Sequence, residues 1–296
     1  MRPVSSASTQ LTGRLMHKLA LGLYISLLLI GCLLAQSTMR NIPVGSGAPM
    51  PPPGISWAEW HSADCITFVG SVCGFPADGT TLTSGTNAWA DRSGNANNLK
   101  YIGGTCTLHT NQLSGHPAVT FPTTTTCHLE WSLNTLGWAT TGVTVFIVVK
   151  PSTGVRSTYI SGPEPSGINT SIAYGTSNSG SRLNNIDQTG VVFTGSGTAT
   201  IDGGWHQLNF TLAKASIGGF PAFRVDRATD TLISGTTING AIWLQNETEV
   251  GIYDCCGFAN PMDGQIAEIL IAASVLGSTD ITGTENYLKL KYPALP

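Results

Sequence analysis

The stretch WADRSGNANNL, residues 89–99, is the most informative segment of this sequence. Its centre at 93–98 has the composition of a tight turn, because glycine accepts positive φ and asparagine side chains bond nearby backbone groups. Asp91 and Arg92 can fix such a turn through charge-assisted hydrogen bonds, and Trp89 can bury its ring beneath it. We therefore expect a structural loop. The alternative role for Asp91 is in a Ca²⁺ site, since calcium prefers carboxylate and amide oxygens.

The composition predicts an all-β, extracellular protein. Of the 296 residues, 41% are hydrophobic, only 10% are charged, and 35 are glycine. Many glycines and threonines with few charges suit short strands joined by tight turns. The net charge of −3 gives no reason to expect nucleic acid or an anionic membrane surface as a partner.

The N-terminus has the order of an export signal. A basic start without acidic residues leads into an unbroken apolar run at 19–35. The run contains Leu-Ile-Gly-Cys, which has the shape of a bacterial lipobox and would make Cys32 the lipidated first residue. Ordinary cleavage after Ala35 and an uncleaved membrane anchor are the open alternatives. We expect residues 1–35 to be this signal or anchor, and the protein to be secreted or held at the cell surface, meeting a membrane only through this segment.

Two further parts follow the export segment. Residues 36–55 are rich in proline, glycine and serine, which predicts an extended tether. From 56 to 296 the chain carries strand-like patterns and tight turns, so we expect one β domain.

Three segments of the domain have clear strand patterns. Residues 143–150 are apolar on both faces, which predicts a strand in the middle of a sheet, covered on each side. Residues 264–273 are also apolar on both faces, except for Glu268, and predict a second strand of this kind. Residues 205–213 alternate, which predicts that Leu208 faces a core while Gln207 and Asn209 face solvent or a ligand.

The one convincing helical pattern lies near the C-terminus, at residues 280–292. Leu288 and Tyr292 are separated by one helical turn and share a face, so we expect this face to pack on the sheet. Lys289 and Lys291 point elsewhere in the same pattern, which predicts that both lysines lie away from the packed face.

Six cysteines follow Cys32, and an even number in an oxidising compartment implies disulfides. Local loop closure and elimination favour three pairs: Cys65–Cys73, Cys106–Cys127 and Cys255–Cys256. The last pair would be strained, because a trans peptide holds neighbouring Cα atoms ~3.8 Å apart. No Cys-x-x-Cys spacing occurs, so we expect no zinc site.

The motifs together resemble LamG-like, concanavalin A-like jelly-roll domains of bacterial surface proteins. WADRSGNANNL is similar to that family's Trp-x-Asp-x-Ser-Gly-Asn-x-Asn signature. Further pieces follow in the family's order: LSGHPAVTF (113–121), VTVFIVVKP (143–151), GWHQL (204–208), FRVD (223–226) and the closing GQIAEILI with YLKLKYP. The resemblance spans about residues 57–293 and implies a two-sheet antiparallel sandwich with a short C-terminal helix.

A carbohydrate-binding module or adhesin is the function that we expect. Sugars stack on aromatic rings and bond to amide and acid groups. The candidate ligand residues are Tyr159, Tyr174, Arg182, Asn185, Trp243 and Tyr253. The alternative is that these side chains pack and form turns in a structural surface component without a ligand. The partner is then a glycan in the first case and neighbouring surface proteins in the second, and neither function needs a cofactor.

Catalysis is the less favoured class. A glycoside hydrolase needs two carboxylates beside the scissile bond. The segment NETEVGIYD places Glu247 and Glu249 on one strand face, but no aspartate lies between them and Gly251 stands where a third acid would be needed. Asp254 and Glu268 have no partner that the sequence reveals. Gly-x-Ser-x-Gly is absent too, so we expect a binding protein rather than a glycoside hydrolase or polysaccharide lyase.

Overall fold

The computed structural model describes residues 50–296, apart from 70–71, 75, 83–86, 123–126, 132–141, 153–156, 162–171, 177–182, 189–191, 198, 200, 202, 213–221, 231, 235–247, 252–253, 256–257 and 260. All described residues belong to one compact unit, Gly45–Pro296. The expected signal or anchor, Cys32 and most of the tether lie outside them. Within the described residues, no helix has both the length and the apolar character needed to cross a bilayer.

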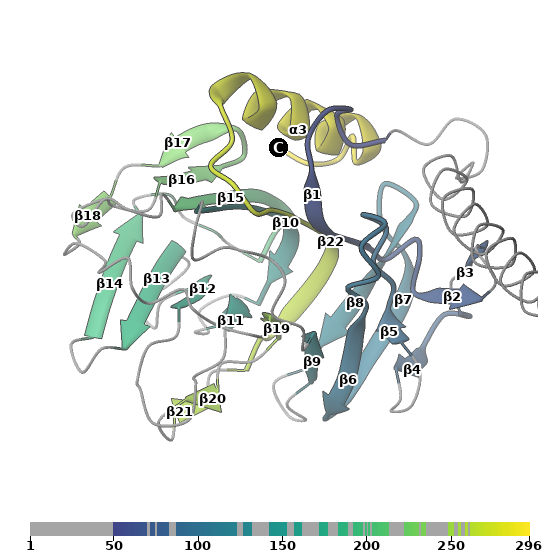
Figure 1. Cartoon of the computed structure of the whole chain (residues 1–296). Helices are drawn as coiled ribbons and strands as arrows, with labels where there is room; N and C mark the ends of the chain where they lie inside the picture. Colours follow the sequence, from purple (N-terminus) through teal and green to yellow (C-terminus); the bar gives the residue numbers. More distant parts are fainter. Residues whose placement is uncertain are drawn as a thin grey trace, which may run out of the picture. The chain divides into compact units, whose positions relative to one another are not determined.

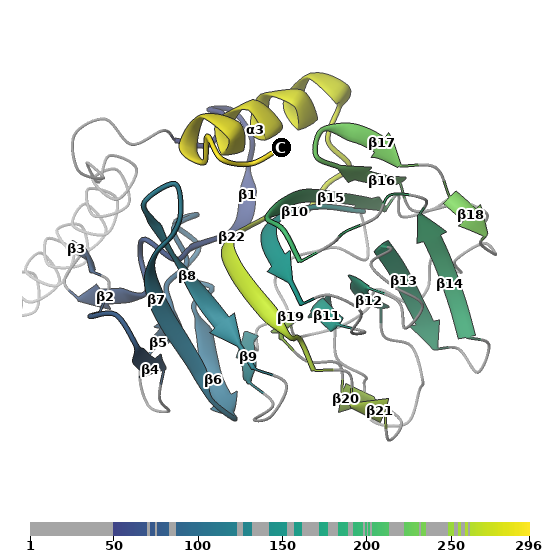
Figure 2. The same ribbon diagram turned by 180° about the vertical axis from the view of Figure 1, so that it is seen from behind.

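Two antiparallel sheets of nine strands each form the body of the domain (Figure 1, Figure 2). The first sheet runs β17-β16-β15-β10-β22-β8-β7-β4, and β1 pairs with one end of β22. Its strands are β1 (Trp57–Ser62), β4 (Thr80–Leu82), β7 (Cys106–Leu113), β8 (His116–Phe121), β10 (Val143–Pro151), β15 (His206–Leu212), β16 (Ala222–Val225), β17 (Ala228–Asp230) and β22 (Gly264–Ala272).

The second sheet runs β18-β14-β13-β12-β11-β19-β9-β6-β5. Its strands are β5 (Asn87–Trp89), β6 (Leu99–Gly103), β9 (His128–Trp131), β11 (Ser157–Ser161), β12 (Ile172–Thr176), β13 (Leu183–Gln188), β14 (Val192–Gly197), β18 (Leu232–Ser234) and β19 (Thr248–Val250). Two small hairpins complete the strands: β2 (Thr67–Val69) with β3 (Val72–Gly74), and β20 (Asp254–Cys255) with β21 (Phe258–Ala259).

The central strand β10 shows how the sequence determines the layers. Val145 and Ile147 belong to the core between the two sheets, together with Leu129 and Ile160 of the second sheet. Phe146 and Val148, which alternate with them on β10, belong to a second apolar cluster on the opposite face. The prediction that this segment lies mid-sheet with both faces covered is confirmed, and so is the predicted two-sheet antiparallel sandwich.

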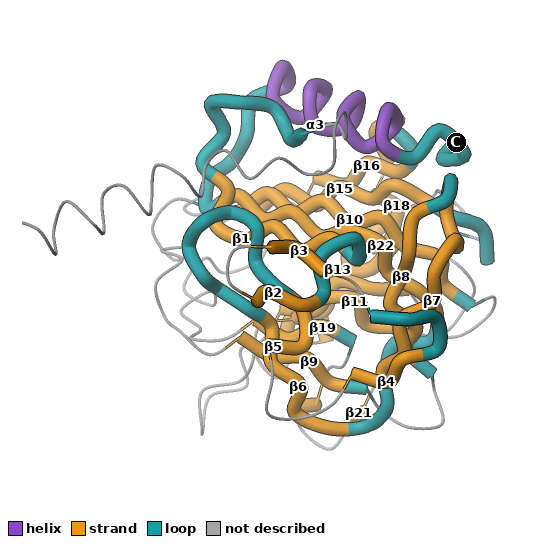
Figure 3. Tube along the Cα trace, turned by 90° about the vertical axis from the view of Figure 1, so that its right-hand side faces the viewer, coloured by secondary structure: helices purple, strands orange, loops and turns teal. Residues whose placement is uncertain are grey.

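The helix α3 (Ser278–Lys291) covers the outer face of the first sheet, beside β15 and β10 (Figure 3). Leu288 and Tyr292 are fully buried in the second apolar cluster, as the helical pattern predicts. The prediction for Lys291 is wrong: only 4% of this residue is exposed. The pattern failed because Lys291 lies at the end of the helix, where it reaches buried acidic groups of the sheet.

The prediction for the polar face of β15 is also wrong. Gln207 and Asn209 are only 3% and 2% exposed, because α3 and its surroundings cover this face of the first sheet. Asn209 compensates its burial by donating from Nδ2 to the carbonyl of Val145 at 3.1 Å. Leu208 faces the core as predicted.

One predicted disulfide is present in full. Cys106 and Cys127 are bonded, and the bond connects β7 of the first sheet to the residue that precedes β9 of the second. Cys65 is disulfide-bonded as well. The side chains of the other three cysteines in the predicted disulfide pattern lie outside the described part of the structure: Cys73, Cys255 and Cys256.

Candidate functional site

The loop at 89–99 folds around the carboxylate of Asp91. Its Oδ1 accepts the backbone N–H groups of Trp60 at 2.9 Å and Ser93 at 2.8 Å. Its Oδ2 accepts the Ser93 hydroxyl at 2.7 Å and the N–H of Asn97 at 2.9 Å. Gly94 has a φ of 92°, the conformation that the turn requires. Four hydrogen-bond donors thus satisfy the carboxylate of one buried acid.

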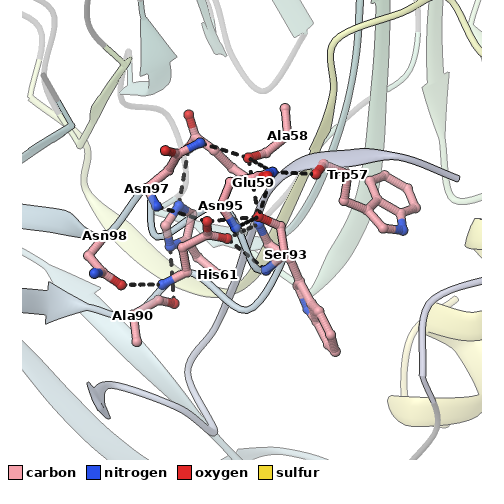
Figure 4. A network of polar contacts seen from close by, with 11 residues as sticks. Trp57, Ala58, Glu59, His61, Ala90, Ser93, Asn95, Asn97 and Asn98 are labelled. Carbon is pink, nitrogen blue, oxygen red and sulfur yellow. Dashed lines mark hydrogen bonds and ion pairs between the residues drawn. The ribbon is translucent and has the colours of Figure 1, made fainter. Parts of the chain in front are cut away.

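The asparagine side chains of the loop fasten it to strand β1 (Figure 4). Asn95 Nδ2 donates to the carbonyls of Trp57 at 2.9 Å and Ala58 at 3.1 Å. Asn97 Nδ2 donates to the Ala58 carbonyl at 2.9 Å. These contacts satisfy backbone groups along β1, so the motif that resembles the LamG signature closes the edge of the sheet.

The same contacts account for Asp91 without a metal ion. All four contacts of its carboxylate are to N–H or O–H donors, whereas a calcium ligand needs lone pairs that face the ion. Among the residues described, no group of three or more His, Cys, Asp or Glu side chains could hold a metal. Arg92 does not pin the turn as expected: its guanidinium lies over the Trp60 ring, 4.0 Å from the ring centre.

A fully buried acid–imidazole pair lies beside this loop. His61 Nε2 is 3.1 Å from Glu59 Oε2, and His61 Nδ1 is 3.3 Å from the carbonyl of Ala90. Burial lowers the pKa of His61, but the hydrogen bond and the charge of Glu59 outweigh burial, and the pKa is raised above 6.5. Because both ring nitrogens face acceptors, the pair favours the doubly protonated imidazolium.

The acid that interrupts the apolar strand β22, Glu268, is fully buried and has four donors. Oε1 accepts from Trp60 Nε1 at 2.7 Å and from the Tyr287 hydroxyl at 2.5 Å. Oε2 accepts from the Tyr292 hydroxyl and from Lys291 Nζ, both at 2.7 Å. Burial and the charge of Glu268 raise the pKa values of both tyrosines well above 10, so both hydroxyls stay protonated donors.

Lys291 extends this cluster to two further groups. Its Nζ lies 2.9 Å from Asp64 Oδ2 and 2.8 Å from Ser62 Oγ. Asp64 Oδ1 is 2.9 Å from His116 Nδ1. Burial raises the pKa of Asp64, but the hydrogen bond from His116 and the charge of Lys291 outweigh it and lower the pKa well below 3.8. The cluster therefore joins the end of α3 to β1, β8 and β22.

The predicted sugar-binding residues are only partly described. Tyr159 is fully buried, and its ring belongs to the core between the sheets. Tyr174 and Asn185 are directly paired on β12 and β13, and Tyr174 also pairs with Ile160, a core residue of β11. The remaining candidates lie outside the described residues: Arg182, Trp243 and Tyr253.

A register line of polar residues crosses four strands of the second sheet. Lys100 on β6 pairs with Glu130 on β9, Glu130 pairs with Glu249 on β19, and Glu249 pairs with Ser161 on β11. Leu99 and Leu129, which precede Lys100 and Glu130, belong to the core, so Lys100 and Glu130 lie on the opposite face of the sheet. Lys100 is exposed, and 20% of the Glu130 side chain is exposed. We call Lys100, Glu130, Glu249 and Ser161 the polar row.

The partner of Glu249 was not predicted from the sequence. Glu130 lies on another strand, far away in the chain, and only the register of β9 and β19 shows that the two glutamates are neighbours. His128 contributes a further polar group, with Nε2 3.9 Å from Glu130 Oε2. No local motif signals this arrangement, because its members come from separate strands.

No family model matches the chain, and no curated protein matches its sequence. Solved structures do match its fold. A Trypanosoma rangeli sialidase in complex with 2,3-difluoro-KDN is 12% identical, with a TM-score of 0.51, over 89% of this chain and 39% of the sialidase chain. This chain thus corresponds to less than half of the sialidase.

Two further solved structures also match. The binding domain of botulinum neurotoxin serotype D is 16% identical, with a TM-score of 0.48, over 70% of this chain and 50% of that one. The CBM40 of the Ruminococcus gnavus IT-sialidase, bound to α2,3-sialyllactose, is 14% identical, with a TM-score of 0.42, over 56% of this chain and 94% of that one. Together with the sheet topology, the sialidase likeness defines the class of this protein as an antiparallel β-sandwich with a C-terminal helix.

Proposed function

We propose that the chain is an exported, surface-tethered carbohydrate-binding module or adhesin whose ligand face is the outer face of the second sheet. The observation that carries this proposal is the polar row, which aligns one cation, two carboxylates and one hydroxyl residue across four strands. Sugar hydroxyls both donate and accept hydrogen bonds, so such a row can hold several of them at once. The resemblance to LamG-like surface domains agrees with a binding role.

Two of the predicted aromatic residues belong to the same face in this proposal. Trp243 precedes β19 in the sequence and Tyr253 follows it, and β19 carries Glu249 of the polar row. In the proposal, both rings stack on the sugar while the polar row bonds its hydroxyls. The sialidase with a similar fold was solved with an acidic sugar derivative, so acidic glycans, which Lys100 can pair with, belong among the ligands to test.

The glutamates of the polar row favour a second candidate function, glycoside hydrolysis. Directly opposite residues on antiparallel strands have Cβ atoms about 4.5–5.5 Å apart. Retaining glycosidases hold their two carboxyl groups about 5–5.5 Å apart, one as nucleophile and one as acid and base. Glu130 and Glu249 are directly opposite each other, so their placement is compatible with this reaction.

A glycan array with the full chain, followed by assays for reducing-end release, separates the candidates. The array should include β-glucans, alginate, galactans and sialylated oligosaccharides. Retention without turnover supports the binding module. Turnover that disappears in Glu130→Gln or Glu249→Gln contradicts the binding module and supports the hydrolase. Neither retention nor turnover would contradict both and favour a structural surface component that packs against neighbouring proteins.

A further inference from the structure

His128 lies beside a carboxylate of the polar row. Leu129, which separates His128 from Glu130 on β9, belongs to the core, so the imidazole and the carboxylate are both on the opposite face of the sheet. His128 Nε2 is 3.9 Å from Glu130 Oε2, and the two side chains are 17% and 20% exposed. Because this distance exceeds a hydrogen bond, the charge of the ring determines how strongly the two groups interact.

The charged residues of β9 and of the two strands paired with it define the electrostatics around this ring. Glu130 is on the strand of His128 itself, and its register partners are Lys100 on β6 and Glu249 on β19. Tyr101, the other titratable residue of β6, packs against the core. Carboxylates and amines ordinarily titrate outside the range from about pH 5 to pH 8, whereas histidine changes its charge within it. Among the residues of these three strands, His128 is therefore the group that responds to pH near neutrality.

We propose that the polar row binds neutral glycans near neutral pH and that protonation of His128 weakens this binding. This regulation rests on the proposed glycan-binding function, whose ligand face it shares. Two carboxylates beside one ammonium group disfavour an acidic glycan. The hydroxyls of a neutral sugar, by contrast, donate readily to carboxylate oxygens.

Protonation of His128 changes what Glu130 offers to a sugar. A carboxylate that keeps its full charge accepts hydroxyl donors in charge-assisted hydrogen bonds, which are roughly twice as strong as neutral ones. An imidazolium 3.9 Å away offsets that charge and attracts the carboxylate toward the ring. The sugar hydroxyl then meets a weaker acceptor. The ligand is held when the ring is neutral and released when it is charged.

Two buried groups of the first sheet show that release in acid is separate from unfolding. The pKa of His61 is raised above 6.5, so its protonated form stabilises the fold. The pKa of Asp64 is lowered, so its contribution is lost only as pH falls below 3.8. Neither group therefore destabilises the domain over the range in which His128 gains its proton.

Titration calorimetry of the full chain with neutral β-glucan and galactan oligosaccharides, at about pH 5 and pH 8, tests the regulation. We expect the wild type to bind about fivefold more tightly at the higher pH, the effect of one exposed ion pair. His128→Gln has a polar side chain that gains no proton, so its affinities at the two pH values should be equal. Equal affinities in the wild type, or tighter binding at the lower pH, would overturn the proposed regulation.

The glycan array separates a failure of this regulation from a failure of the proposed function. Retention of acidic glycans alone would overturn the neutral ligand class and leave the binding module in place. Retention of no glycan at either pH would contradict the binding module and the regulation together.

His109→Gln is the matched control. His109 also lies beside an acid, with Nδ1 3.6 Å from Asp78 Oδ1, but it is on β7 of the first sheet. This variant should keep the fivefold ratio of affinities. Loss of the ratio in His109→Gln, or its persistence in His128→Gln, would refute the assignment to His128. If His128→Gln fails to fold, Glu130→Gln decides, because an amide forms no ion pair with the ring and the ratio should fall to one.

Discussion

The ammonium group of Lys291 lies 2.7 Å from the carboxylate of Glu268, and the two belong to a helix and a strand that are separate in the chain. The carboxylate of Glu268 loses its hydration shell in the protein interior. Four hydrogen-bond donors take the place of that shell. The last turn of α3 is therefore held on the first sheet by one acid. The polar residues under this helix explain why a short, moderately apolar segment packs so closely.

Replacing Glu268 by alanine should destabilise the domain by about 3–5 kcal/mol, because it leaves the Trp60 N–H and two tyrosine hydroxyls buried without their acceptor and takes from Lys291 one of its two carboxylates. Urea denaturation followed by fluorescence measures the change. Leu290→Ala, at a position of α3 that is 72% exposed, should cost no more than about 0.5 kcal/mol. Equal effects of the two substitutions would contradict the anchoring role of Glu268.

Replacing Asp91 by alanine should cost roughly 2–4 kcal/mol, since the buried N–H groups of Trp60 and Asn97 lose their acceptor. Because the loop needs no ion in this account, EDTA and added Ca²⁺ should leave the melting temperature of the wild type unchanged. Differential scanning calorimetry tests both statements. A calcium-dependent melting temperature that is lost in Asp91→Ala would restore the metal role.

Stability should depend on pH through His61. Its pKa is raised above 6.5 in the folded state, so the protonated ring stabilises the fold. This contribution is complete below pH 6.5 and is lost as pH rises through the folded pKa. Asp64 has a lowered pKa, and its contribution is lost only as pH falls below 3.8, so it does not vary in the same range.

The measurement compares wild type and His61→Gln in urea between about pH 5 and pH 9. The difference in unfolding free energy should shrink as pH rises. A difference that stays constant or grows with pH would show that His61 is neutral in the folded protein.

Removing the Cys106–Cys127 disulfide by a double alanine substitution should destabilise the protein by about 2–4 kcal/mol. The bond closes a loop of 21 residues and connects the two sheets, so the unfolded chain gains freedom when it is absent. Thermal unfolding under non-reducing conditions measures the loss. An unchanged transition would mean that the bond does not form in solution.

The fold was largely predictable because its signals are local. The apolar run at 143–150 and the helical pattern at 280–292 each correspond to one observed element, β10 and α3. Turn chemistry likewise identified the loop around Gly94, whose positive φ the structure shows. Periodicity is a property of neighbouring residues, so a single sequence reveals it.

The polar partners were not predictable, because they come from distant segments. Glu268 had no visible partner in the sequence, and Lys291 was expected away from the packed face, yet the two are bonded. The pairing of Glu130 with Glu249 depends on the register between strands that are not consecutive. The predicted face of Gln207 failed for the same reason: alternation shows two faces but not that a remote helix covers one of them.

The most direct test of the proposed glycan-binding face is the affinity of Glu130→Gln for the best ligand from the array, measured by titration calorimetry. Asp280→Asn is the matched control, because it removes one exposed acid from α3, on the first sheet. We expect Glu130→Gln to weaken binding by about 1–3 kcal/mol, the cost of leaving ligand groups without a charged partner, and Asp280→Asn to bind like the wild type. Equal affinity of Glu130→Gln and the wild type would contradict the proposal that the outer face of the second sheet binds the glycan.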